Sequence, residues 1–392
     1  MKNFVHCVPT RFVFGRGAEE QVGEQVRDFG GTKVLIHYGG GSAVRSGLID
    51  RVRQSLDAAG ISSVLLGGVQ PNPRDTLVYE GIELARREGV DFILAVGGGS
   101  VIDSSKAIAH GLCYDGDFWD FFCGKATPAR TTPFGAVLTM SAAGSESSNS
   151  CVITQDSTKT KRGLSTQLNR CLFAIMNPEL PMTLPPYQIA CGATDILAHI
   201  MERYFTTEKE VDLIDRMAEG AMQAVIRAAR IAVKDPSNYD AQAQLMWGST
   251  VAHNDTLGVG RTQDWGSHQI EHELSALYDV PHGAGLAVVM PAWMRYHMNK
   301  NVMRFAQYAV RVHGCAMNFE NPEETALRGI ECHETFLRDI GMPLTLKELG
   351  ARTEDIPALA AKTKRGNPDG TTGGVFPMTP TDIEAILRIA DR

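Results

Sequence analysis

Residues 92–103 read Phe92-Ile93-Leu94-Ala95-Val96-Gly97-Gly98-Gly99-Ser100-Val101-Ile102-Asp103, an apolar run that ends in three glycines and continues into a helical pattern. A short apolar run bounded by glycines is typical of a strand buried on both faces of a parallel sheet. The segment Gly39-Gly40-Gly41-Ser42 follows another such run, residues 33–38, in the same way. Two strand-to-glycine-to-helix units in one chain predict the βαβ topology of a parallel sheet.

Similar patterns extend this sheet in both directions along the chain. Further strands are expected at residues 63–66 and 134–138, and the β-rich stretch 11–15 is expected to pair at a sheet edge. Apolar residues at helical spacing predict helices at 47–59 and 76–88 between the strands. The first part of the chain is therefore an α/β domain with a Rossmann-like parallel sheet.

A proline-rich segment at residues 181–186 separates this pattern from a different one. Beyond it, strand-like runs nearly vanish and helical periodicity dominates, as in residues 212–233 and 301–312. We therefore predict an α/β domain over residues 1–184 and an all-α domain over residues 185–392.

Length and composition agree with this division and exclude several classes of protein. The chain has 392 residues, more than the roughly 250–300 at which single cores stop growing. Its net charge of −7 argues against nucleic acid as a partner. We find neither a signal-peptide pattern nor an apolar run long enough to span a membrane, so a cytoplasmic protein is expected. Its eight cysteines form no C-x-x-C pair, so neither a zinc knuckle nor a disulfide framework is indicated.

The two glycine segments are candidate phosphate-binding turns. Where a strand leads into a helix, glycines let the backbone approach a phosphate, and the helix N-terminus offers unpaired N–H groups. Neither segment matches G-x-G-x-x-G, so a tight turn without a ligand is the alternative for each one. Their joint occurrence favours a dinucleotide, and the candidate contacts are Gly39, Gly40, Gly41, Ser42, Gly97, Gly98, Gly99 and Ser100.

Three more residues are candidates for the cofactor site. Thr139 and Ser141 follow the predicted strand 134–138, where open α/β sheets bind ligands. Asp103 either contacts the cofactor or is a favourable charge near a helix N-terminus. An acid after the strand 33–38 would bind a ribose 2′-OH, but Ser42 and Arg45 are found there instead, which favours NADP over NAD.

A second group of residues has the chemistry of a metal site. Asp195 and His199 are spaced i,i+4, which places them on one face of a helix, and His268 and His272 repeat this spacing. His282 follows shortly afterwards. Each histidine alone is more often an ordinary helix residue, but one carboxylate with several imidazoles suits a divalent metal such as Fe²⁺ or Zn²⁺. The second pair is not H-E-x-x-H, so a metalloprotease is not indicated.

With these motifs in order, the chain closely resembles the iron-containing alcohol dehydrogenase family, in particular its butanol dehydrogenase and NADPH-dependent aldehyde reductase branch. The resemblance runs from residues 12–15 through the glycine turns, Gln70-Pro71-Asn72-Pro73 and residues 143–146 to the histidines. It implies that Asp195, His199, His268 and His282 bind the metal. It further implies that His272 lies beside the substrate and nicotinamide, that Asn72 belongs to the cofactor site, and that the protein is a homodimer.

The chain departs from the family pattern in two places. Met140-Ser141 replaces a common Leu-Pro, and Glu271 stands where a small residue is usual. Neither departure removes a ligand, but both affect the expected shape of the nicotinamide and substrate pockets.

The predicted function is hydride transfer between NADP(H) and a small primary alcohol or aldehyde. The metal would polarise the substrate oxygen as a Lewis acid, and His272 would relay a proton or only shape the pocket. One rival is a lyase of the dehydroquinate synthase type, which would need a cluster of Lys and Arg near the metal; the segments around Asp195 and from His268 to His282 contain almost none. The other rival is a non-enzymatic nucleotide or metal sensor on the same fold.

Overall fold

The computed structural model describes residues 1–363 and 366–392, which form two compact units. One unit is Cys7–Thr183, and the other combines Met1–His6 with Leu184–Arg392. The first six residues thus differ from the predicted division, which placed them with the α/β domain. They join the helical unit because the Lys2 amide donates a hydrogen bond to the Gly260 carbonyl oxygen at 2.8 Å.

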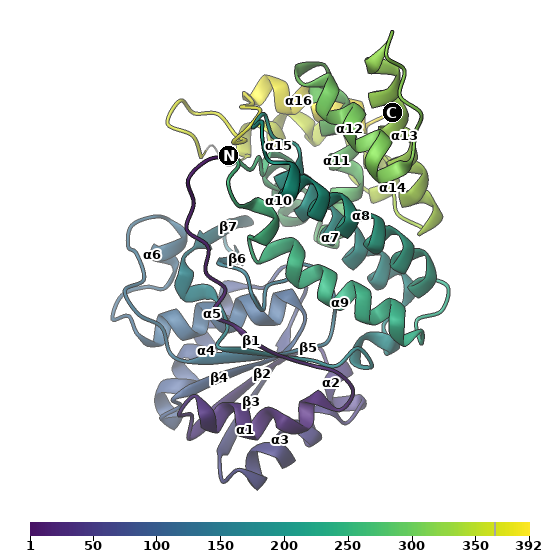
Figure 1. Ribbon diagram of the computed structural model, residues 1–392. Coiled ribbons are helices and arrows are strands. Elements are labelled where there is room, and N and C mark those ends of the chain that lie inside the picture. Colours follow the sequence, from purple (N-terminus) through teal and green to yellow (C-terminus); the bar gives the residue numbers. More distant parts are fainter. Residues whose placement is uncertain (364–365) are drawn as a thin grey trace. The chain divides into compact units, whose positions relative to one another are not determined.

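The α/β unit contains a six-stranded sheet (Figure 1). Every strand pair in it is parallel, and the order is β1-β8-β5-β4-β2-β3. Its strands are β1 (Arg11–Phe14), β2 (Lys33–Gly39), β3 (Ser62–Val69), β4 (Phe92–Gly97), β5 (Phe134–Leu138) and β8 (Phe173–Met176). The expected parallel sheet is confirmed, with β1 at an edge. The patterns named no strand at β8 or in the antiparallel hairpin of β6 (Ser150–Gln155) and β7 (Thr160–Ser165).

Helices cover both faces of this sheet, with α1 and α3 on one side and α4 and α5 on the other (Figure 1). Val34 and Ile36 of β2 join the core formed with α1 and α3, whereas Leu35 between them faces the opposite way. The helices of this unit are α1 (Val22–Asp28), α2 (Ser42–Arg45), α3 (Leu48–Ala58), α4 (Asp75–Glu88), α5 (Gly99–Leu112) and α6 (Trp119–Phe122).

The strand order creates a switch point between β2 and β4. The chain moves outward from β2 to β3 and then returns past β2 to β4, so the direction of the sheet reverses there. In open α/β sheets, ligands bind outside the carboxyl ends of the strands at this reversal. Tyr38 pairs with Val96 and Gly97 pairs with Leu138, so both glycine turns leave neighbouring strands at the same edge.

The second unit is helical, as predicted. Its helices are α7 (Pro186–Tyr204), α8 (Asp212–Ala232), α9 (Tyr239–His253), α10 (Gly266–Tyr278), α11 (His282–His297), α12 (Val302–His313), α13 (Pro322–Asp339), α14 (Leu346–Leu349), α15 (Ile356–Lys362) and α16 (Pro380–Ala390). No helix among the described residues has the length and apolarity needed to cross a membrane.

Helix α7 is the central element of this unit. It begins at Pro186, where the missing N–H is not needed. Every residue from Ile189 to Tyr204 is buried, including two acids, a histidine and an arginine. Because charged side chains are seldom buried without partners, these four polar residues point to a specific local arrangement.

Close packing of α11 on α7 yields the first prediction. A Cβ atom at Gly283 would lie 2.0 Å from the carbonyl oxygen of Cys191, a backbone atom. We expect Gly283→Ala to destabilise the protein by about 1–3 kcal/mol, because the two helices must move apart.

The matched control is Gly220→Ala in α8, where an added Cβ meets no atom within 4 Å. Alanine should stabilise this exposed helical site by about 0.5–1 kcal/mol. Calorimetric midpoints that fall equally, or not at all, in the two variants would contradict the close-contact argument.

Candidate active site

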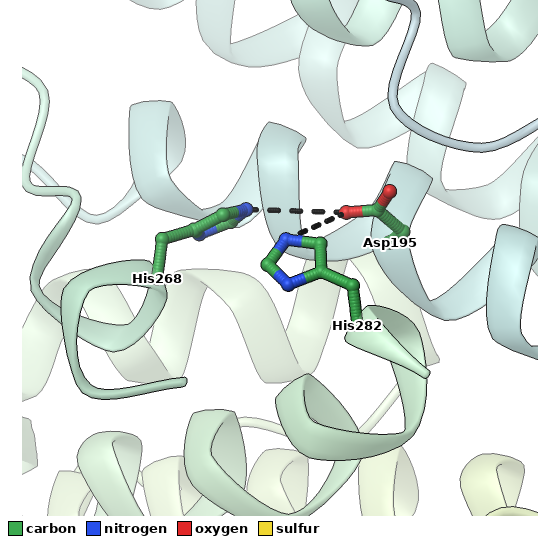
Figure 2. Close-up of side chains that lie close together, drawn as sticks. All are labelled: Asp195, His268 and His282. Atoms are coloured by element: carbon green, nitrogen blue, oxygen red, sulfur yellow. Dashed lines mark ion pairs between the residues drawn. The ribbon is translucent and has the colours of Figure 1, made fainter. Parts of the chain in front are cut away.

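The predicted metal ligands lie on three helices of the helical unit. Asp195 is on α7, His268 is on the first turn of α10, and His282 is the first residue of α11. Their side chains point toward one another (Figure 2). Nε2 of His268 lies 4.0 Å and Nε2 of His282 lies 3.7 Å from Oδ1 of Asp195. The structure thus gathers three candidate donor atoms within 4.8 Å of one another.

His199, the fourth predicted ligand, adjoins this cluster. Its ring centroid lies 4.6 Å from that of His268. Its Nδ1 donates a hydrogen bond to the carbonyl oxygen of Asp195 at 2.8 Å and lies 3.1 Å from the carboxylate oxygen Oδ1. The i,i+4 spacing on α7 therefore brings this imidazole to the same side of the helix as the carboxylate.

Two atoms of this cluster lack the hydrogen bonds that burial normally demands. In the part of the chain that the structure describes, neither Oδ1 of Asp195 nor Nε2 of His268 has a hydrogen-bond partner, although both atoms are buried. Leaving such groups unsatisfied costs free energy, so they call for an explanation such as a bound ion. An anionic oxygen facing two imidazole nitrogens fits a divalent cation.

The pKa shifts of His268 and Asp195 also favour binding of a cation. Burial lowers the pKa of His268 well below 6.5, so its imidazole is neutral and its lone pair is available at neutral pH. Burial alone would raise the pKa of Asp195, but His199 and His282 outweigh it and hold that pKa below the usual range. The carboxylate is therefore ionised.

Glu202, one turn after His199, holds His268 in place. Its Oε1 accepts hydrogen bonds from Nδ1 of His268 at 2.9 Å and from the His268 amide at 3.1 Å. Its Oε2 accepts from the amide of Trp265 at 2.7 Å. Trp265 has φ of 67°, an unfavourable conformation for a bulky residue, and Glu202 stabilises it at the start of α10.

Glu271 plays a corresponding part beside His282. Its carboxylate Oε2 accepts a hydrogen bond from Nδ1 of His282, and its Oε1 accepts one from Ser275. The ring centroid of His272, the predicted catalytic residue, lies 5.6 Å from that of His282, so His272 is next to the candidate metal ligands. Glu271, His272 and His282 also bring donor atoms within 4.8 Å of one another.

Glu202 is a residue that the sequence patterns missed. A single glutamate in an apolar helix gives no spacing signal, although its position three residues after His199 shows that it lies on the same helix face.

In the α/β unit, the second glycine turn lies against the loop after β5. A Cβ atom at Gly98 would lie 3.2 Å from Cβ of Met140, and one at Gly99 would lie 3.3 Å from Cβ of Ala143. These glycines allow the N-terminus of α5 to approach the loop that begins at Thr139. The hydroxyl of Ser141 in this loop is buried and has no hydrogen-bond partner among the described residues. The Ser141 hydroxyl is thus available to a ligand beside the N-terminus of α5.

Asp103 and Asn72 have partners within the protein. The Asp103 carboxylate accepts hydrogen bonds from Ser145 and from the amide of Val152 at 2.8 Å, which supports the alternative that it stabilises the local fold. Asn72 accepts a hydrogen bond from Nζ of Lys161 at 2.9 Å. Lys161, on the unpredicted hairpin, is another polar residue at this edge that the sequence analysis did not single out.

A switch-point sheet with two glycine turns, together with a helical cluster of one carboxylate and three imidazoles, defines a class of metal-dependent nicotinamide oxidoreductases. The profile of iron-containing alcohol dehydrogenases matches residues 9–178, and the C-terminal profile of the same family matches residues 189–390. The chain belongs to the iron-containing alcohol dehydrogenase family. Membership implies a divalent metal and a nicotinamide cofactor.

Relatives and solved structures agree over the full length. The chain is 39% identical over 388 residues, 99% of both chains, to a probable NADH-dependent butanol dehydrogenase of Bacillus subtilis. It is 36% identical to the NADPH-dependent aldehyde reductase YqhD of Escherichia coli, covering 92% of this chain and 93% of that protein. The crystal structure of NADH-dependent butanol dehydrogenase A from Thermotoga maritima superposes with a TM-score of 0.96 at 39% identity, covering 100% and 99% of the two chains.

Removal of the central carboxylate provides a direct test of the cluster. For the wild-type protein, free Co²⁺ or Zn²⁺ at 100 times its Kd should stabilise the fold by about 2.7 kcal/mol. Asp195→Asn should lose this stabilisation, because the only anionic donor of the group is gone. The exposed Asp279→Asn, at the end of α10, should respond as the wild type does. A metal-dependent thermal shift that persists in Asp195→Asn would show that the cation binds elsewhere.

Proposed function

We propose that this protein transfers hydride between a nicotinamide cofactor and a small primary alcohol or aldehyde, with a divalent metal bound by Asp195, His199, His268 and His282. The pair of unsatisfied buried atoms, Oδ1 of Asp195 and Nε2 of His268, is the observation on which the metal site rests. The names of the relatives, butanol dehydrogenase and aldehyde reductase, support this substrate class.

The protein's own residues contribute to the reaction by supplying the metal donors and by orienting two of them. The four side chains supply one carboxylate and three imidazoles, a set that suits Fe²⁺ or Zn²⁺ equally. A cation held there would supply Lewis-acid polarisation of a carbonyl or alcohol oxygen. Glu202 and Glu271 restrict the rings of His268 and His282, so that each Nε2 is directed toward Asp195.

His272 is the proposed proton carrier for the substrate oxygen. Reduction of an aldehyde requires a proton as well as a hydride, and imidazole suits this task near neutral pH. His272 lies one helical turn after His268 and beside the ring of His282. Only 8% of its surface is exposed, so a substrate that reaches it leaves bulk water.

Neither rival function gains support from the relatives, whose names describe alcohol and aldehyde oxidoreductases. A steady-state assay with butanal separates the possibilities. Oxidation of the reduced nicotinamide in proportion to butanal supports the proposal, and tight nucleotide binding without turnover supports a sensor. The expected homodimer and cytoplasmic location remain predictions.

We propose that NADPH is preferred over NADH, although relatives are named for either cofactor. A Cβ atom at Gly40 would meet no atom within 4 Å, so there is space beside the first glycine turn. One at Gly41 would lie 3.1 Å from Nη1 of Arg45, so the guanidinium lies over the same turn. Open space next to a cation suits a 2′-phosphate.

The cofactor prediction is tested by adding one charge to this turn. Gly40→Asp should lower kcat/KM for NADPH at least about tenfold, equivalent to 1.4 kcal/mol, while NADH is affected less. Gly40→Asn has nearly the same shape without the charge and serves as the control. A wild-type protein that uses NADH as efficiently as NADPH would refute the preference.

The roles of His268 and His272 are tested by replacing each of them, because the two variants should lose different properties. His268→Ala should lose metal and activity together, because a ligand is removed. His272→Ala should retain the metal while kcat falls roughly 10²–10⁴-fold, the usual range for a general acid–base group. Metal content and single-turnover rates distinguish the two. Metal loss in His272→Ala with full metal in His268→Ala would reverse the assignment.

A further inference from the structure

Glu271 is a buried carboxylate that the proposed chemistry does not require. None of its surface is exposed, although it lies on α10 between the metal-cluster residue His268 and the proposed proton carrier His272. Burial of a carboxylate is costly unless it is hydrogen-bonded or paired. Its two oxygens accept hydrogen bonds from His282 and Ser275, so the side chain is held at both ends.

The neighbouring helix is shaped to admit this side chain. A Cβ atom at Gly285 on α11 would lie 2.6 Å from Oε1, 2.7 Å from Cγ and 3.1 Å from Cδ of Glu271. All three of the nearest atoms belong to Glu271. The glycine one turn after His282 therefore leaves the space that the Glu271 side chain occupies, and the two positions form a matched pair.

His282 is the cluster residue that most needs such support. Its side chain is 24% exposed, compared with 5% for His268 and 5% for His199. It is also the first residue of α11, so no preceding helical turn restricts its ring. Packing alone therefore restrains this imidazole less than the other two.

His268 and His199 show the effect of a hydrogen bond at Nδ1. Nδ1 of His268 donates a hydrogen bond to Glu202 at 2.9 Å, and Nδ1 of His199 donates one to the Asp195 carbonyl oxygen at 2.8 Å. A histidine whose Nδ1–H donates to an oxygen keeps its Nε2 lone pair for a metal, and the acceptor makes that ligand more basic. Glu271 completes the same arrangement for the third ring.

We propose that Glu271 is a positioning residue that fixes the tautomer and orientation of His282 and thereby tightens metal binding, an inference that rests on the metal site of the proposed function. Because Nδ1 of His282 donates its hydrogen bond to Glu271, that nitrogen is not available to a second cation. Glu271, His272 and His282 therefore serve the one metal site and do not form a second.

The first experiment measures metal affinity by chelator competition, with the metal-free proteins compared by circular dichroism. Glu271→Gln should retain one metal per chain but bind it about tenfold more weakly, and Glu271→Ala up to about 100-fold more weakly. With Co²⁺ as the probe, both variants should also show a shifted visible absorption spectrum, which a remote structural change would not produce.

The matched control is Glu273→Gln, which removes another buried carboxylate of α10. Its Oε2 lies 3.7 Å from Nζ of Lys362 instead of near the cluster. This variant should bind Co²⁺ with the wild-type affinity and spectrum, even if it lowers the melting temperature.

The second experiment uses the pairing with Gly285. Gly285→Ala should weaken metal binding in the presence of Glu271, because the methyl group displaces its carboxylate. In the Glu271→Ala background the same methyl group fills vacated space, so it should change the affinity by no more than about twofold. Equal effects in the two backgrounds would contradict the proposed pair.

The outcomes separate this inference from the function on which it rests. If the wild-type protein binds no metal, the proposed function fails. If it binds one metal and both Glu271 variants match it in affinity and spectrum, only the role of Glu271 is overturned. Two metals per chain, with one lost in Glu271→Gln, would overturn it in favour of a second metal site.

Discussion

Burial of the Asp195 carboxylate is the constraint on which the helical unit depends. The residue lies on α7, whose side chains are buried from Ile189 to Tyr204, and its Oδ1 has no hydrogen-bond partner among the described residues. An ionised carboxylate is stable in such surroundings only beside positive charge. Nε2 of His268 and Nε2 of His282 both lie within 4.0 Å of this oxygen, and the partner that we propose for it is a divalent cation held between these atoms.

Glu202 supports both a proposed metal ligand and the backbone at the start of α10. Glu202 orients His268 and also accepts the amide of Trp265, whose φ of 67° begins α10. Loss of this carboxylate would release the strained residue and the ligand together. Glu271 is different, because its contacts with His282 and Ser275 involve side chains and leave the helix backbone intact. Substitution of Glu271 therefore affects the site more selectively than substitution of Glu202.

The sequence predicted those features that depend on short-range patterns. Apolar runs identified β2, β3, β4 and β5, and i,i+4 spacing placed Asp195 and His199 on one face of a helix. Strand β7, which contains Lys161 and Arg162, was missed because its polar residues give no apolar run, whereas β8 was missed although all of its residues are apolar. Glu202 and Gly285 acquire their significance through contacts with α10, which pattern analysis of their own helices does not reveal. Glu271 was recognised as unusual, but its function depends on the space at Gly285.

The first glycine turn and the proposed metal ligands differ in how tightly their residues are constrained. Each imidazole of the cluster is tied to a second group, so a change there disturbs several contacts. At the first glycine turn Gly40 and Arg45 are exposed, and surface loops tolerate substitution. A relative named for NADH and one named for NADPH are nearly equally similar to this chain, at 39% and 36% identity. Overall similarity therefore carries little information about the cofactor, and the proposed preference for NADPH rests on the few side chains around Gly40.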